Sequence, residues 1–173
     1  MSEIQPWRKP RPAPQLPEIN GHQSAIPNWL RSWWPALVWA AFIFIMSTDS
    51  FSAEHTASVI EPMLRLFIHS LTKAQFTVIH HLIRKSAHFT EYFVFFLLLY
   101  HGVRGGRGGW RWTWGLTALF IAAAYSATDE IHQAFVASRG ASPWDSLLDS
   151  TGAFVALVFV FLWFRLRKTK GQE

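Results

Sequence analysis

The sequence predicts an all-α polytopic membrane protein with about four transmembrane helices and an interfacial amphipathic helical segment in the first extracytoplasmic loop. Half of the 173 residues are apolar and are gathered into runs, while the basic residues occupy the gaps between the runs. A soluble basic domain would instead mix both kinds of residue along each amphipathic helix. Most of the tryptophans stand at the ends of the runs, where an interfacial aromatic belt would place them.

The composition excludes several classes of protein. Because the chain has no cysteine, it has no disulfide framework, zinc ribbon, iron–sulfur cluster or thiol nucleophile. A net charge of +5 suits either a nucleic-acid binder or a membrane surface. Since the basic residues avoid the apolar runs, we expect membrane lipids as partners and no nucleic acid.

Residues 1–28 differ in composition from the rest of the chain. They hold six of the nine prolines and few aliphatic residues, too little apolar surface to drive folding. We expect a disordered Pro-rich cytoplasmic tail here, and no cleaved signal peptide, because the first apolar run starts too late. A transmembrane domain should follow over residues 29–167, with a short basic cytoplasmic tail over residues 168–173.

Four apolar runs are the candidate membrane spans. A helix needs about 20 residues to cross the hydrocarbon core, with about 17 as the lower limit. The third and fourth runs reach this length, and the first two reach it only with their flanking Trp, Ser and His residues. A soluble buried bundle stays open as the alternative, because short apolar runs are ambiguous. The runs cover residues 33–46, 93–100, 112–127 and 147–164.

The segment over residues 51–83 carries apolar side chains at helical spacing, among them Val59, Met63 and Phe67. This pattern predicts one or two amphipathic helices lying at the membrane interface. Pro62 should break or kink a single helix at this point.

Lysine and arginine positions predict the orientation of the chain, because cytoplasmic loops carry the excess of both. With four spans, eleven basic residues fall on one side and five on the other, so both termini should be cytoplasmic. The glycine-rich stretch over residues 102–109 lacks the G-K-[ST] ending of a phosphate loop and is interpreted as a basic turn. The eleven residues are Arg8, Lys9, Arg11, Arg31, Arg104, Arg107, Arg111, Arg165, Arg167, Lys168 and Lys170.

Two polar stretches interrupt the spans on the opposite side, over residues 84–93 and 125–153. Ionisable groups within a membrane are costly and are candidate functional residues. On a helix, Lys85, His88 and Tyr92 share one face. In the second stretch Asp129, His132 and Gln133 share a face, and Glu130 is offset from it by about 100°.

The start of the last run has a structural interpretation of its own. Ser142 and Pro143 form a helix start, with Ser142 as N-cap and Pro143 at the first helical position, so Asp145 is either a first-turn acid or a functional residue. Asp149 lies one turn deeper, on a face with Gly152. We expect Asp149 to point into the bundle and to meet a cation there. The two candidate cations are Arg139 and Lys85.

These polar residues resemble the motifs of the VanZ-like membrane protein family. The resemblance covers roughly residues 33–165. Two positions depart from the family pattern: Arg84 stands where an acidic residue is frequent, and Ala156 where a second glycine is common. The matching residues are Lys85, His88, Phe89, Tyr92, Asp129, Glu130, Gln133, Phe135, Arg139, Asp145, Asp149 and Gly152.

The resemblance implies a four-span helical protein of the bacterial cytoplasmic membrane whose polar motifs gather at one membrane face. The family's namesake is linked to resistance to teicoplanin, a glycopeptide that binds cell-wall precursors. The resemblance brings no established reaction with it, so turnover is left open and the mechanism must come from the residues.

Three hypotheses follow, and none of them involves a cofactor. In the first, an extracytoplasmic pocket binds or modifies an envelope precursor, such as a lipid carrier or a peptidoglycan fragment, with a possible relation to glycopeptide tolerance. His88 with Asp129 or Glu130 would be the acid/base pair, because histidine titrates near neutral pH. Cationic groups would hold phosphate or carboxylate. The residues expected to bind or position the ligand are Lys85, Tyr92, Gln133, Arg139, Asp145 and Asp149.

In the second hypothesis the same residues form a buried salt-bridge network that fixes helix packing, with function in partner contacts. The third is a metal site, which we do not favour because the histidines lack an H-E-x-x-H or other closed spacing. Its ligands would come from His81, His88, Asp129 and His132.

Overall fold

A computed structural model of the chain describes residues 27–48, 52–136 and 142–170. These residues form five α-helices and no strand, so the predicted all-α class is confirmed. The predicted N-terminal tail lies outside the described residues except for its last two positions, and so does Arg139. The helices are α1 (Asn28–Met46), α2 (Ala53–Phe67), α3 (Lys73–Arg104), α4 (Trp112–Ala134) and α5 (Pro143–Lys170).

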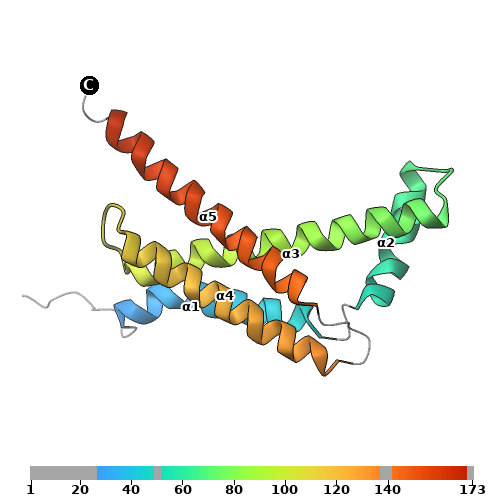
Figure 1. Cartoon of the computed structure of the whole chain (residues 1–173), viewed down its shortest axis with the longest axis horizontal. Helices are drawn as coiled ribbons and strands as arrows, with labels where there is room; N and C mark the ends of the chain where they lie inside the picture. The colour runs from blue at the N-terminus through green and yellow to red at the C-terminus, as the bar shows by residue number, and fades with distance from the viewer. Residues whose placement is uncertain (1–26, 49–51, 137–141, 171–173) are drawn as a thin grey trace, which may run out of the picture.

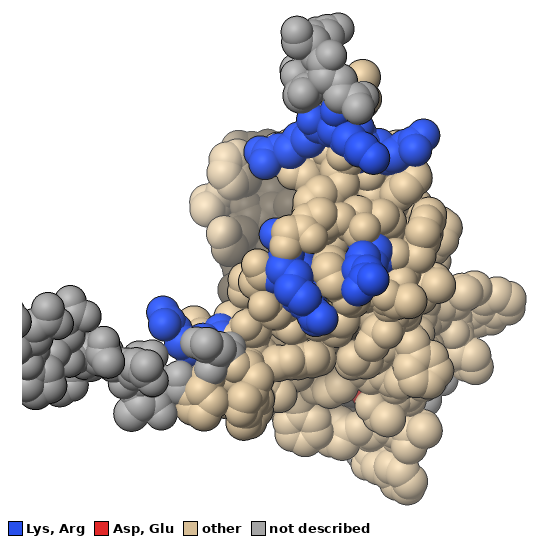
Figure 2. Space-filling view, turned by 90° about the vertical axis from the view of Figure 1, so that its left-hand side faces the viewer, with Lys and Arg blue, Asp and Glu red and all other residues tan. Residues whose placement is uncertain are grey.

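Four of the helices pack into a bundle in which successive members alternate in direction (Figure 1). Helices α1 and α4 begin at the end where α3 and α5 finish. This end, called the basic end below, carries seven described Lys and Arg side chains, and Figure 2 shows that Asp and Glu are almost absent from its surface. The basic residues described there are Arg31, Arg104, Arg107, Arg111, Arg165, Arg167 and Lys168.

The bundle core combines aromatic side chains of α3 with small residues of α4 and α5. Tyr92 and Phe96 are fully buried, as are Ala118 of α4 and Ala156 of α5. Helices α3 and α5 approach closely at Gly152, where an added Cβ would collide with the carbonyl oxygen of Phe89. The small-residue face predicted around Gly152 is therefore a helix contact.

Helix α2 and the first turns of α3 project from the bundle as a hairpin (Figure 1). The predicted amphipathic segment is thus α2 plus the start of a 32-residue α3, which begins with a capping box between Thr72 and Gln75. Pro62 lies inside α2 and does not end it. Of the predicted break or kink at this position, the break is therefore wrong. The apolar face of α2 is exposed along its length, at Val59, Met63, Leu66 and Phe67.

Two of the helices are long and apolar enough to cross a membrane by length and composition, over Trp29–Met46 and Pro143–Thr169. These segments contain the first and fourth predicted spans. Helices α3 and α4, which contain the other two, do not meet the same criterion among the described residues.

Candidate functional site

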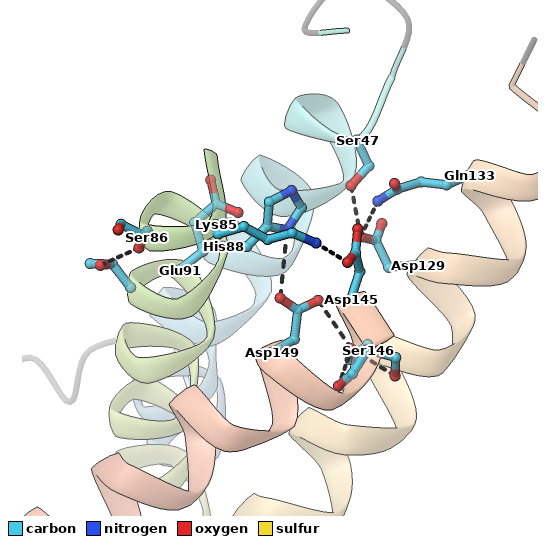
Figure 3. A network of polar contacts seen from close by, with 12 residues as sticks. Ser47, Lys85, Ser86, His88, Glu91, Asp129, Gln133, Asp145, Ser146 and Asp149 are labelled. Carbon is cyan, nitrogen blue, oxygen red and sulfur yellow. Dashed lines mark hydrogen bonds and ion pairs between the residues drawn. The ribbon is translucent and has the colours of Figure 1, made fainter. Parts of the chain in front are cut away.

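The polar residues gather at the end of the bundle opposite the basic end, where they form a buried inner layer and a half-exposed outer layer (Figure 3). In the inner layer, Asp129 of α4 is 5% exposed. Its Oδ2 accepts hydrogen bonds from Ser47 Oγ at 2.8 Å and from Gln133 Nε2 at 3.0 Å. Asp129 therefore ties α4 to the residue that follows α1.

Asp149 of α5 is the second carboxylate of the inner layer and is 2% exposed. Its Oδ2 accepts a hydrogen bond from Ser126 Oγ of α4 at 3.1 Å. Its Oδ1 lies 3.6 Å from Nδ1 of His88 on α3, which is within ion-pair distance but longer than a hydrogen bond. Asp149 thus contacts two neighbouring helices at once, as expected of an acid that points into the bundle.

Four buried polar atoms of the inner layer have no hydrogen-bond partner within the described part of the chain. They are the second oxygens of Asp129 and Asp149, the hydroxyl of Tyr92 and Nδ1 of His88. Tyr92 lies within electrostatic reach of both carboxylates. Because buried polar atoms are normally paired, this layer keeps an unused capacity to donate and accept hydrogen bonds.

The outer layer joins α3 to the start of α5. Lys85 Nζ forms an ion pair with Oδ1 of Asp145, and both side chains are about one-third exposed. Lys85 therefore contacts Asp145 rather than Asp149, and the other predicted partner, Arg139, lies outside the described residues. Helix α5 begins at Pro143, as predicted, and Glu130 Oε1 accepts a hydrogen bond from the backbone N–H of Ser142.

A cavity of ≈ 320 Å³ lies between α2, α3 and α5 at this layer and is called the outer pocket below. A second, mainly apolar cavity of ≈ 200 Å³ lies beside it, between α1, α2 and α3, and is called the apolar cavity. Arg84 and His88 line both of them. The polar residues that line the outer pocket are Thr77, His80, His81, Arg84, Lys85, His88 and Asp145.

Arg84 is a site residue that the sequence reasoning treated only as a departure from a family pattern. Its Nη1 is buried and has no hydrogen-bond partner among the described residues. The available signal was the four-residue repeat of His80, Arg84 and His88, which places all three on one face of a helix.

Comparison with known proteins supports the resemblance. The family model VanZ/LLP1 matches residues 32–165, most of the chain. The chain belongs to the VanZ/LLP1 family. No curated protein and no solved structure matches it. Together with the two apolar helices, family membership indicates a membrane protein.

The VanZ-like structure does not join the predicted acid/base residues by direct contacts. Within the described ranges, no hydrogen bond or ion pair joins His88 to Asp129 or Glu130. Asp129 is held by Ser47 and Gln133, and Glu130 binds a backbone amide. The carboxylate next to His88 is Asp149.

The metal hypothesis has no geometric support in the part of the chain that the structure describes. No group of three or more His, Asp or Glu side chains there is arranged to hold a metal ion. The ring of His132 packs at a tilt of 34° against the ring of Phe44, with centroids 4.7 Å apart. His132 therefore packs α4 against α1.

His80 connects the projecting hairpin to the pocket of this VanZ-like protein. Its Nε2 lies 3.1 Å from Thr56 Oγ1 of α2, and its ring stacks on Phe76 at 5.5 Å. Burial lowers the pKa of His80 below its ordinary value, and the nearby Arg84 and His81 lower the pKa further. The folded state therefore favours the neutral imidazole of His80 over its charged form.

Acidification should weaken this contact between α2 and α3. Because the pKa of His80 is lower in the folded protein than its unfolded value of about 6.5, the stabilisation is complete above that pH and is lost as the pH falls below it. Distances between spin labels at Ser58→Cys and Ala74→Cys, in a chain without native cysteine, should lengthen between pH 7 and pH 5 by about the width of a side chain.

The matched variants for this experiment are His80→Gln and His69→Gln. His80→Gln keeps a hydrogen-bonding group near Thr56 but cannot become charged, so its distances should not change with pH. His69→Gln, at an exposed loop position, should behave like the native chain. A pH response that persists in His80→Gln would assign it to another group.

Proposed function

We propose that this VanZ-like protein is a four-span protein of the bacterial cytoplasmic membrane whose outer pocket binds the anionic headgroup of a lipid-linked envelope precursor on the extracytoplasmic side. Both termini are then cytoplasmic. The proposal is supported by the alternating direction of the four bundle helices and by the collection of basic residues at one end.

The lengths of α3 and α4 support four spans. Residues 85–104 of α3 and the 23 residues of α4 are each long enough for a hydrocarbon core of about 30 Å, at about 1.5 Å per residue. Helix α3 packs antiparallel to α1 and α4, and α4 packs antiparallel to α5, so both belong to the same bundle as the two apolar helices. Part of the lower hydropathy of α4 comes from polar residues that the bundle buries, such as Asp129 and Gln133.

The observation that carries the ligand proposal is the position of Arg84 between a polar pocket and an apolar cavity. A guanidinium offers paired N–H donors that match the oxygens of phosphate or carboxylate. With Lys85 largely neutralised by Asp145, the unpaired Nη1 of Arg84 is the strongest available donor. A phosphate in the outer pocket would leave its hydrocarbon chain directed into the apolar cavity.

The level of the outer pocket relative to the membrane fits a lipid headgroup. Helix α2 lines both cavities and exposes a row of apolar side chains, including Met63 and Phe67, on its outer face. Such a helix lies in the plane of the membrane interface. The outer pocket below it is then level with phosphate headgroups, and His88, which lines both cavities, is the titratable group placed to exchange a proton with a ligand there.

Binding of a short isoprenyl phosphate tests the proposal. Farnesyl phosphate should bind the purified full-length protein in neutral detergent, and farnesol should bind at least tenfold more weakly because it lacks the charge. Arg84→Gln should weaken farnesyl phosphate binding by about tenfold, the usual size of a lost charge-assisted hydrogen bond. Calorimetric titration measures both differences.

Lys73→Gln is the matched control for Arg84→Gln. Lys73 lies on the same helix, is exposed and does not line either cavity, and its replacement removes the same charge. Equal loss of affinity in the two variants would indicate a diffuse electrostatic effect and count against a pocket. In cells that express the protein, the same pair extends the test to teicoplanin susceptibility, because a protein that sequesters wall precursors changes the exposed target of a glycopeptide.

The second candidate function is the packing network, and the inner layer favours it. Asp129 and Asp149 are almost completely buried and each is held by hydroxyl or amide donors from other turns or helices. A network of this kind can specify helix packing without a ligand. We therefore propose that the inner layer fixes the packing of the helices and that the outer pocket binds the ligand.

A further inference from the structure

The basic end of the molecule carries a groove that the proposed function does not use. Its volume is ≈ 680 Å³, and it runs between the start of α4 and the last turns of α5. Figure 1 shows α5 leaving the bundle toward its C-terminus, and Figure 2 shows a recess below the uppermost group of basic side chains. We call it the basic-end groove.

The floor of the basic-end groove is a cluster of aromatic rings. Trp110 of the α3–α4 connection and Trp112, the first residue of α4, pack edge to face at 5.4 Å. Phe161 of α5 lies 5.7 Å from Trp110 and 5.0 Å from Trp112, and Phe164 lies 6.4 Å from Trp110. The four rings hold one another in place and offer a preformed apolar surface.

The rim of the groove is cationic, and within the described part of the chain none of its basic side chains pairs with an acidic one. Arg165, Arg167 and Lys168 line it, and the sequence contains no Asp or Glu over residues 92–128 or 150–172. Within the described ranges no ion pair forms at this end. Arg165 lies 5.8 Å from the ring of Phe161 and Arg167 lies 4.4 Å from the ring of Trp163, contacts that leave the charge of both arginines without a counter-ion. Arg107, by contrast, donates hydrogen bonds to backbone carbonyl groups within its own turn. The rim therefore attracts an anion from outside the chain.

We infer that the basic-end groove is a binding site for an anionic diacyl phospholipid, with the headgroup phosphate on the Arg165–Lys168 rim and the start of one acyl chain on the Trp110–Phe161 floor. Basic pockets between membrane helices bind the headgroups of anionic lipids. The groove lies at the end of an apolar helix that is long enough to cross a membrane, which is the level at which such headgroups occur. A soluble phosphate compound would use the rim but not the aromatic floor.

Native mass spectrometry of the full-length protein in neutral detergent, titrated with dioleoylphosphatidylglycerol, tests this site. One tightly held molecule of the anionic lipid is expected, and dioleoylphosphatidylcholine should not displace it. The double variant R165Q/K168Q should bind the anionic lipid about 25-fold more weakly, because the loss of each cation near an anionic headgroup lowers the affinity about fivefold.

The double variant R31Q/R111Q is the matched control, because it removes two positive charges from the same end outside the groove. Its affinity should stay within about twofold of the native chain, because salt screens charges that lie outside the groove. Equal weakening of the two variants, or displacement of the lipid by millimolar glycerol phosphate, would overturn the proposal. If R165Q/K168Q does not fold, K168Q against R31Q makes the same comparison at two exposed side chains.

Discussion

Replacing Gly152 by alanine should destabilise the protein strongly and lower its melting temperature. An added Cβ would lie 2.4 Å from the carbonyl oxygen of Phe89 and 3.3 Å from its Cα, so it would collide with backbone that cannot rotate away. Helices α3 and α5 would have to move apart along their whole contact. Overpacking at such a position costs about 3 kcal/mol, which corresponds to a melting temperature roughly 10 °C lower for a chain of this size.

Gly108→Ala is the control for Gly152→Ala. An added Cβ at Gly108 meets nothing within 4 Å, and the residue does not need a positive φ. Its melting temperature in detergent should equal that of the native chain. Similar melting of Gly108→Ala and Gly152→Ala would show that the close approach of α3 and α5 is not needed for folding.

The small-residue face of α5 could be predicted because it depends only on spacing along one helix. Asp149 and Gly152 recur at helical intervals, and the structure places both toward the interior. The start of α5 at Pro143 could be predicted for the same reason, since the residues that begin a helix form a local pattern.

The pairing of charges across helices could not be predicted in the same way. Whether Lys85 meets Asp145 or Asp149 depends on the rotation and axial offset of α3 against α5, and one turn of offset exchanges the two acids. Arg84 was not recognised because its importance comes from two cavities formed with α2, and the sequence does not reveal how α2 packs on α3.

The length of α3 was missed although a signal was present. Its first turns have an amphipathic pattern and its later turns an apolar one, which suggests two elements. No glycine or proline occurs between Lys73 and His101, however, so nothing in the sequence ends a helix between the two patterns. The consequence is functional, because one rigid helix carries the residues of the outer pocket from the interface into the bundle.

Asp149→Ala should destabilise the protein strongly, whereas Asp145→Asn should leave it folded. Asp149→Ala removes the charged acceptor of the buried Ser126 hydroxyl, which is left with only the neutral oxygens of Ser146, and it removes the carboxylate that faces His88. Breaking buried polar contacts of this kind costs about 3 kcal/mol. The ion pair of Asp145 with Lys85 is partly exposed, and such pairs contribute about 0–1 kcal/mol.

The two variants should also differ in ligand binding, which separates the two layers of the site. Asp145→Asn frees Lys85 from its counter-ion and raises the positive charge of the outer pocket, so farnesyl phosphate should bind several-fold more tightly. If all the polar residues formed a single packing network, Asp145→Asn would instead lower the melting temperature as Asp149→Ala does and leave binding unchanged. Thermal unfolding and titration of both proteins therefore decide whether the outer layer holds a ligand or only holds the helices together.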